Sequence, residues 1–218
     1  MHVNRQNIGK FWPIPRKGTK YLAVSSHNQK SSIPLIVVMR DILKLVRTKK
    51  ELKLVINKKE IKINGKEIRD TNYPIGFFDI ISIESLKKNY RASLGDNKKI
   101  VFEEVPDNEA VRRTFKIIGK KVLGKDKIQL NLVNGRNVLT KEKANVDDSA
   151  VFNFNENKIE KIVKLEKGNQ VFVLKGKHTG KRGKIEDVVE RGGKKLIVID
   201  GKDGKVNVWV KNVIVMDM

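Results

Sequence analysis

The amino-acid sequence predicts a multi-domain protein of the α+β class. Two helical patterns lie between residues 35 and 56, and strand-like alternation with Gly-containing turns dominates the residues that follow. The 218 residues suffice for one large domain or two to three small ones. Hydrophobic residues make up 39% of the chain, which is below the usual range but enough for a divided core.

Residues 1–30 are predicted to form an extended, basic N-terminal arm. The segment carries six lysines and arginines and no acidic residue. Pro13 and Pro15 flank Ile14 and disfavour a regular helix at that point. The aromatic residues Phe11, Trp12 and Tyr21 among the basic ones favour an arm anchored on a polyanion, and a flexible tail is the alternative.

Residues 31–90 are predicted to form two helices, a hairpin and a further strand. The first helix has one apolar stripe, made of Leu35, Val38, Met39, Ile42, Leu43 and Val46. Thr48 to Glu51 form a capping box that opens the second helix, whose stripe is Leu52, Val55 and Ile56. Asn64-Gly65 predicts a tight turn after the strand Ile61–Ile63, and Ile80–Ile83 predicts a later strand.

The remaining residues are predicted to form two β-rich domains. In residues 91–165, alternation over 127–132 and the turn Asn134-Gly135 indicate a hairpin. Residues 166–218 hold eight of the 16 glycines, with five short strand-like runs between them. Such closely spaced strands are typical of a small barrel.

The charge balance indicates the class of partner. Lysine and arginine number 47 and acidic residues 25, so the net charge is +22, and the isoelectric point is about 10.1. A surface of this kind repels itself unless a polyanion neutralises it, and nucleic acid is the most common polyanion. A chain that its charge merely keeps soluble is the alternative.

Several basic residues are expected to contact RNA. Arg40 and Lys44 lie four residues apart on the first predicted helix, as do Lys49 and Lys53 on the second, so each pair is expected on one helix face. Packing of the two helices would join these pairs into one basic surface, although an ordinary solvated face is equally compatible with the spacing. The other expected contacts in the first two regions are Lys58, Lys62 and Lys66 near the hairpin and Arg5, Lys10, Trp12, Arg16 and Lys17 in the arm.

A glycine-rich basic stretch over 176–185 is a second candidate for RNA binding. It reads Gly-Lys-His-Thr-Gly-Lys-Arg-Gly-Lys-Ile, and its glycines permit tight turns and close backbone approach. A turn that contacts nothing, or another protein, is the alternative. The expected contacts are Lys175, Lys177, His178, Lys181, Arg182 and Lys184.

The stretches around Arg40 to Leu43, Thr48 to Lys53 and Ile61 to Gly65 together resemble the S-four-type RNA-binding module. That module presents two helices and a hairpin to structured RNA. Its second helix usually carries arginines where this chain has Lys49 and Lys53, and lysine lacks the bidentate fork of arginine. The resemblance therefore implies an RNA-binding module over residues 31–90 whose contacts are looser than usual.

The longer pattern is similar to the archaeal and eukaryotic ribosomal protein family S-four-e. It includes the segments over 12–18, 73–81 and 128–137, in the family's order. The stretch over 176–185 resembles a KOW motif, which implies an SH3-like barrel over 166–218. Asp147 stands where the family more often has Gly, which calls the geometry of that turn into question.

The family resemblance implies a non-enzymatic, structural constituent of the small ribosomal subunit. The implied partners are small-subunit rRNA and neighbouring ribosomal proteins in the cytoplasm, with no membrane and no small-molecule substrate. An RNA-modifying enzyme that carries the module as an accessory, or a transcription-elongation factor with a KOW motif, are the alternatives. The chain has no cysteine, only three histidines, and neither a catalytic triad nor a nucleotide-binding fingerprint, so we expect no metal and no cofactor.

Overall fold

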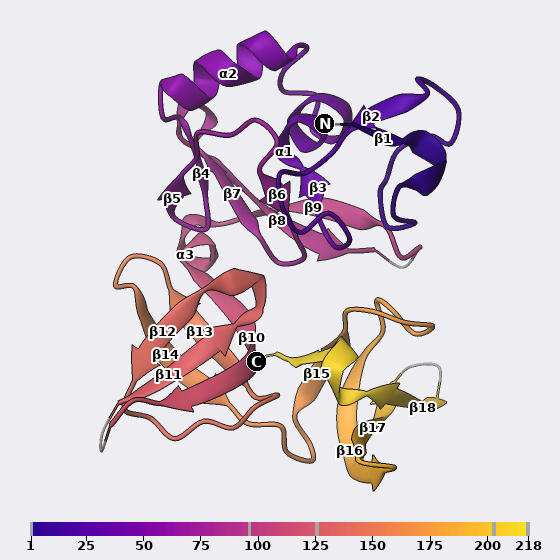
Figure 1. The fold of residues 1–218 in the computed structure, drawn as a ribbon, viewed down its shortest axis with the longest axis vertical. Coiled ribbons are helices and arrows are strands. Elements are labelled where there is room, and N and C mark those ends of the chain that lie inside the picture. The colour runs from indigo at the N-terminus through magenta and orange to yellow at the C-terminus, as the bar shows by residue number, and fades with distance from the viewer. Residues whose placement is uncertain (1, 96, 125–126, 202–203, 217–218) are drawn as a thin grey trace. The chain divides into compact units, whose positions relative to one another are not determined.

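The computed structural model describes residues 2–95, 97–124, 127–201 and 204–216. The chain splits into two compact units, Met1–Val111 and Arg112–Met218 (Figure 1). Strands predominate in both units, so the described part of the chain is mostly β with few helices. The helical share is smaller than the α+β prediction implied.

The first unit contains three small sheets. A five-stranded sheet has the order β5-β4-β7-β8-β9, and two-stranded sheets join β1 to β2 and β3 to β6. The strands are β1 (His2–Asn4), β2 (Tyr21–Ala23), β3 (Ile33–Pro34), β4 (Ile61–Ile63), β5 (Lys66–Glu67), β6 (Pro74–Ile75), β7 (Ile80–Ile83), β8 (Lys88–Leu94) and β9 (Ile100–Val105). The helical segments are η1 (Arg5–Asn7), α1 (Leu35–Val37), η2 (Val38–Ile42), α2 (Lys49–Asn57), η3 (Glu84–Leu86) and α3 (Asp107–Ala110).

The N-terminal segment folds back on itself, so the prediction of an extended arm is wrong. β1 pairs antiparallel with β2, and His2 lies opposite Ala23. The Arg5 side chain closes the loop between the strands, because it donates hydrogen bonds to the Pro15 and Thr19 carbonyls at 2.6 and 2.7 Å. A hairpin cross-linked in this way has a defined shape before any partner binds.

The first predicted helix is shorter than its apolar stripe. α1 continues into a π-helical turn, η2, and the backbone then turns at Lys44, whose φ is +56°. The Leu45 amide donates to the Met39 carbonyl at 2.9 Å and closes the helix end. Val46 is buried, but it lies beyond the helix, so the stripe mixes helical and loop positions.

The second predicted helix and the hairpin are confirmed. The Thr48 side chain accepts a hydrogen bond from the Glu51 amide, and Leu52 and Ile56 are buried beneath α2. Asn64 and Gly65 both have positive φ, as a primed turn requires. The Asp79 carboxylate fastens this turn, because it accepts from Asn64 Nδ2 at 2.6 Å and from the Gly76 amide at 2.5 Å.

The five-stranded sheet of the first unit extends further along the chain than the sequence indicated. The predicted boundary between residues 90 and 91 falls inside β8, and β9 pairs with β8 over its whole length. With β8, β9 and the short helix α3 that follows them, the first unit extends to Val111.

The second unit consists of two five-stranded antiparallel sheets. Their orders are β12-β11-β10-β13-β14 and β18-β17-β16-β15-β19. The strands are β10 (Arg112–Val122), β11 (Ile128–Leu132), β12 (Asn137–Thr140), β13 (Ser149–Asn153), β14 (Lys158–Val163), β15 (Gln170–Val173), β16 (Arg182–Arg191), β17 (Lys194–Gly201), β18 (Gly204–Trp209) and β19 (Val213–Val215). The short helical turns are η4 (Val133–Gly135) and η5 (Val210–Asn212). All five strands predicted within 166–218 are present.

A buried lysine connects the two sheets of the second unit. Lys116 on β10 is 5% exposed, and its ammonium donates to the carbonyls of Val210 in η5 and Val213 in β19. Asp147, 3.0 Å away, compensates the charge. Desolvation lowers the pKa of Lys116, while its hydrogen bond to Asp147 acts in the opposite direction. Asp147 has φ +78°, the left-handed region that glycine normally occupies, so the departure from the family pattern coincides with this ion pair.

We predict that Asp147→Asn destabilises the protein by about 1–2 kcal/mol, because it leaves the buried ammonium with neutral acceptors alone. Asparagine also tolerates positive φ, so the substitution isolates the charge. Urea unfolding measures the change. The control is Asp187→Asn, which removes an exposed ion pair to Lys167 and is expected to leave the midpoint nearly unchanged. Equal midpoints for wild type and Asp147→Asn would contradict the role of this pair.

We predict that Gly183→Ala destabilises the protein by about 1–3 kcal/mol through overpacking. An added Cβ would collide with the Asp200 carbonyl and lie 2.6 Å from Ile199 Cγ2, so β16 and β17 would have to separate. Thermal unfolding measures the loss. Gly119→Ala is the matched control, because its Cβ would meet only Asn131 atoms at 3.6 Å or more. A loss as large in the control as in Gly183→Ala would argue against this close approach.

Candidate nucleic-acid interface

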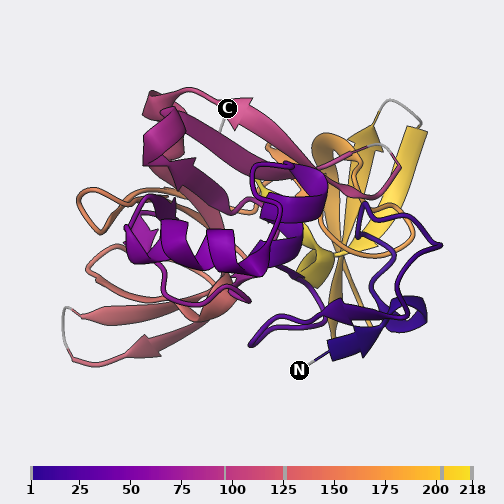
Figure 2. The ribbon, with the colours of Figure 1, turned by 90° about the horizontal axis from the view of Figure 1, so that it is seen from above.

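α2 carries a row of exposed lysines on the outside of the first unit. Leu52 and Ile56 face the interior, which leaves Lys49 and Lys53 exposed one helical turn apart. Figures 1 and 2 both show α2 at the surface of this unit. The structure adds two cations to the predicted set, Lys50 on the helix and Arg47 immediately before it, and both are exposed.

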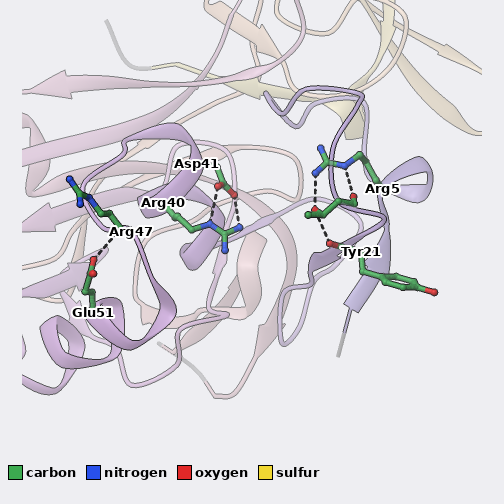
Figure 3. Close-up of polar contacts among 7 residues, drawn as sticks. Arg5, Tyr21, Arg40, Asp41, Arg47 and Glu51 are labelled. Atoms are coloured by element: carbon green, nitrogen blue, oxygen red, sulfur yellow. Dashed lines mark hydrogen bonds and ion pairs between the residues drawn. The ribbon is translucent and has the colours of Figure 1, made fainter.

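The one carboxylate on α2 is already occupied by the backbone. Glu51 accepts a hydrogen bond from the Arg47 amide at 2.7 Å, one residue before the amide expected of a capping box. This bond is the main reason why the pKa of Glu51 is lowered. The Arg47 guanidinium points away from Glu51 in Figure 3. Neither Lys49, Lys50 nor Lys53 is ion-paired to a carboxylate of the described residues.

The predicted pair Arg40 and Lys44 does not share a helix face, because the helix ends before Lys44. Arg40 is held by its neighbour Asp41 through two hydrogen bonds of 2.9 Å, as Figure 3 shows. This contact raises the pKa of Arg40. Lys44 is exposed in the turn that leads to α2. The spacing argument therefore held for α2 and failed for the first helix.

The hairpin lysines differ in their partners. Lys62 is paired with Glu84 at 2.5 Å, and this hydrogen bond raises the pKa of Lys62. Lys58, at the end of α2, and Lys66, on β5, are exposed. Of the predicted lysines at the hairpin, Lys62 alone is neutralised by a described carboxylate.

The N-terminal hairpin presents some of its predicted residues and buries others. Lys10, Arg16 and Lys17 are exposed. Trp12 is only 5% exposed, so the indole belongs to the core and the expectation that it contacts RNA is corrected. The guanidinium of Arg5 is taken up by the Pro15 and Thr19 oxygens. The apolar neighbours of Trp12, Phe11 and Pro13, were the available signal for its burial.

The glycine-rich stretch of the second unit forms a tight loop between β15 and β16. Gly176 and Gly180 have φ of +107° and +90°, and the Thr179 hydroxyl donates to the Gly176 carbonyl at 2.5 Å. Lys175, Lys177 and Lys184 are exposed, whereas His178 and Lys181 are half-buried. The guanidinium of Arg182 lies 5.4 Å from the centre of the Phe172 ring. The loop thus gathers cations at one end of the sheet.

Neither a metal centre nor a membrane-spanning helix is found in the part of the chain that the structure describes. No group of three or more His, Cys, Asp or Glu side chains there is arranged to hold a metal ion. No helix there is long and apolar enough to cross a membrane.

Comparison with known proteins identifies the family. The model of ribosomal family S4e matches residues 86–159. The small ribosomal subunit protein eS4 of Methanocella arvoryzae is 33% identical over 208 residues, which cover 93% of this chain and 88% of the relative. The eS4 protein of Methanospirillum hungatei is also 33% identical and covers 99% of this chain and 92% of its own.

A solved structure supports the same assignment. The crystal structure of the 30S ribosomal protein S4e from Thermoplasma acidophilum superposes with a TM-score of 0.72 at 25% identity. The match covers 85% of this chain and 95% of that protein. On the strength of the full-length relatives and this shared fold, the chain belongs to ribosomal family S4e.

Proposed function

We propose that this chain is a structural constituent of the small ribosomal subunit that binds rRNA through basic surfaces and thereby supports translation in the cytoplasm. Its relatives are named small ribosomal subunit proteins, and we extend that role to this chain. The family is made of ribosomal proteins rather than enzymes, so the chain is not an enzyme. Neighbouring ribosomal proteins are its further partners.

The main observation behind the proposal is the group of cations on and beside α2 that have no carboxylate partner among the described residues. We define the α2 surface as Lys44, Arg47, Lys49, Lys50, Lys53 and Lys58. Cations that lack protein partners are available to phosphates, and release of the counterions around RNA then drives binding. Because structured RNA is recognised mainly by its shape, phosphates and 2′-hydroxyls, a lysine-rich helix suits it without reading bases.

The proposal includes an assignment of domains. Residues 1–30 form a basic hairpin, the S-four-type module expected over 31–90 extends through the sheet that ends with β9, the central β-rich domain expected over 91–165 follows it, and 166–218 form the SH3-like KOW barrel. The order of two helices, a hairpin and a strand supports the module, and the glycine loop beside β15 to β19 supports the barrel. Because β8 and β9 belong to the sheet of the first unit, we place the junction of the module and the central domain after Val111.

We assign RNA contacts to the exposed cations at three places. They are the α2 surface with Lys66, the N-terminal hairpin with Lys10, Arg16 and Lys17, and the glycine loop with Lys175, Lys177, Arg182 and Lys184. Arg5, Arg40 and Lys62 have polar partners within the protein. We therefore assign them a structural role in shaping these surfaces and not a direct contact with RNA.

We predict tight, salt-sensitive binding of the full chain to fragments of small-subunit rRNA. Filter binding against increasing salt measures the affinity, with transfer RNA and duplex DNA as controls of similar charge. The small-subunit fragments are expected to bind about tenfold or more tightly than the controls at physiological salt. Equal affinity for all three nucleic acids would contradict specific rRNA binding.

We predict that the double variant Lys49→Gln and Lys53→Gln weakens binding to rRNA and reduces the slope of log K against log salt by about 1.4–1.8, since each phosphate contact contributes about 0.7–0.9. The matched control is Lys141→Gln with Lys143→Gln, two exposed lysines of the second unit. The control variant loses the same two positive charges, but at positions outside the surfaces proposed to bind RNA. If both double variants change the slope equally, binding follows net charge and the α2 surface has no special role.

A further inference from the structure

Tyr21 is the exposed aromatic residue of the N-terminal hairpin. It is 50% exposed, although Leu22 beside it is 6% exposed. Its ring projects away from the hairpin and from the Arg5 contacts, as Figure 3 shows. Half of this aromatic side chain is therefore accessible to a partner. The hairpin therefore sorts its aromatic residues, with Trp12 in the core and Tyr21 outside.

The ring is held in place from two sides. The His2 ring on the paired strand meets Tyr21 edge-on, with centroids 4.6 Å apart and planes at 70°. The Lys20 ammonium lies 5.3 Å from the centre of the Tyr21 ring. The pairing of Asn4 with Tyr21 and of His2 with Ala23 fixes the backbone beneath the two rings. Tyr21 is thus presented on a strand rather than on a mobile tail.

The N-terminal hairpin that carries Tyr21 is rich in exposed cations and has no acidic residue. Residues 2–40 contain no acidic side chain. Lys10, Arg16, Lys17 and Lys20 are exposed in the same hairpin, and none of them is ion-paired to a described carboxylate. An exposed aromatic face among unpaired cations is the combination that single-stranded nucleic acids require, because bases stack on the ring while phosphates approach the cations.

We propose that Tyr21, supported by His2 and flanked by Lys20, is a stacking site for an unpaired RNA base. The inference rests on the proposed rRNA-binding function and adds to it a site that recognises single-stranded RNA. The base stacks on the tyrosine ring, and the neighbouring phosphate is neutralised by the lysine side chain that leaves the ring. This exchange is favourable because an exposed cation–π contact is weaker than base stacking.

Unpaired RNA fits the site better than a duplex does. The bases of an A-form helix are stacked on one another, so an aromatic side chain cannot reach the face of a base. The α2 surface, which offers cations without an exposed aromatic ring, suits the phosphates of folded RNA. The two surfaces of the first unit are therefore expected to bind different features of rRNA.

The test compares Tyr21→Leu with Tyr21→Phe in the full chain. The probe is single-stranded oligouridine of about ten nucleotides, within the usual range of site sizes. Tyr21→Leu is expected to lower the affinity about fivefold or more with an unchanged salt slope, whereas Tyr21→Phe keeps the affinity within about twofold. Lys17→Gln is the electrostatic control, and it is expected to reduce the salt slope by about 0.7.

Wild-type affinity for oligouridine in Tyr21→Leu, or an equal loss in Tyr21→Phe, would overturn the stacking site. Ultraviolet crosslinking of the wild-type chain to oligouridine, mapped by mass spectrometry, gives a second measurement that does not depend on the variants folding. An adduct on Tyr21 supports the site, and adducts confined to other residues overturn it.

If the wild-type chain prefers small-subunit rRNA while Tyr21→Leu binds oligouridine normally, the stacking site alone fails. If the wild-type chain has no such preference, the proposed function fails as well.

Discussion

The excess of cations over carboxylates is the physical constraint on which the surface of this protein depends. With 47 lysines and arginines against 25 acidic residues, the chain carries a net charge of +22 that its own carboxylates do not balance. A carboxylate whose oxygens accept hydrogen bonds from backbone amides, such as Glu51, is less available to neighbouring cations. The self-repulsion of this charge destabilises the compact state, and a polyanion that neutralises the charge relieves it.

Several of the acidic side chains stabilise the fold itself. Glu51 satisfies an amide at the start of α2, and Asp79 fastens the β4–β5 hairpin to the turn that precedes β7. Asp148 accepts a hydrogen bond from the Leu165 amide, and its neighbour Asp147 compensates Lys116. These acids lie beside backbone amides or buried groups, so they do not screen the exposed lysines of α2. The α2 surface stays positive because these carboxylates are bound to backbone amides and to Lys116.

Local chemistry made part of this structure predictable from the sequence. Thr48 as a helix cap, the Asn64-Gly65 turn and the five strands after residue 166 depend on near neighbours, and each was predicted correctly. The early end of the first helix was not predicted, because the residue with positive φ there is Lys44 and not a glycine, which would have indicated the turn. The burial of Trp12 and the capture of Arg5 by Pro15 depend on contacts across the hairpin, which residue spacing does not encode. For the site, exposed lysines on a helix were foreseeable, whereas the distinction between Tyr21 and Trp12 required tertiary structure.

The closed form of the N-terminal hairpin affects the thermodynamics of any association. A basic tail that became ordered on RNA would lose conformational entropy at that moment, and a large negative heat-capacity change would accompany its folding. The strand pairing between His2 and Ala23 and the Arg5 contacts place that ordering in the folding of the free protein instead. Association through this segment then resembles the docking of a rigid body, so its enthalpy should vary little with temperature.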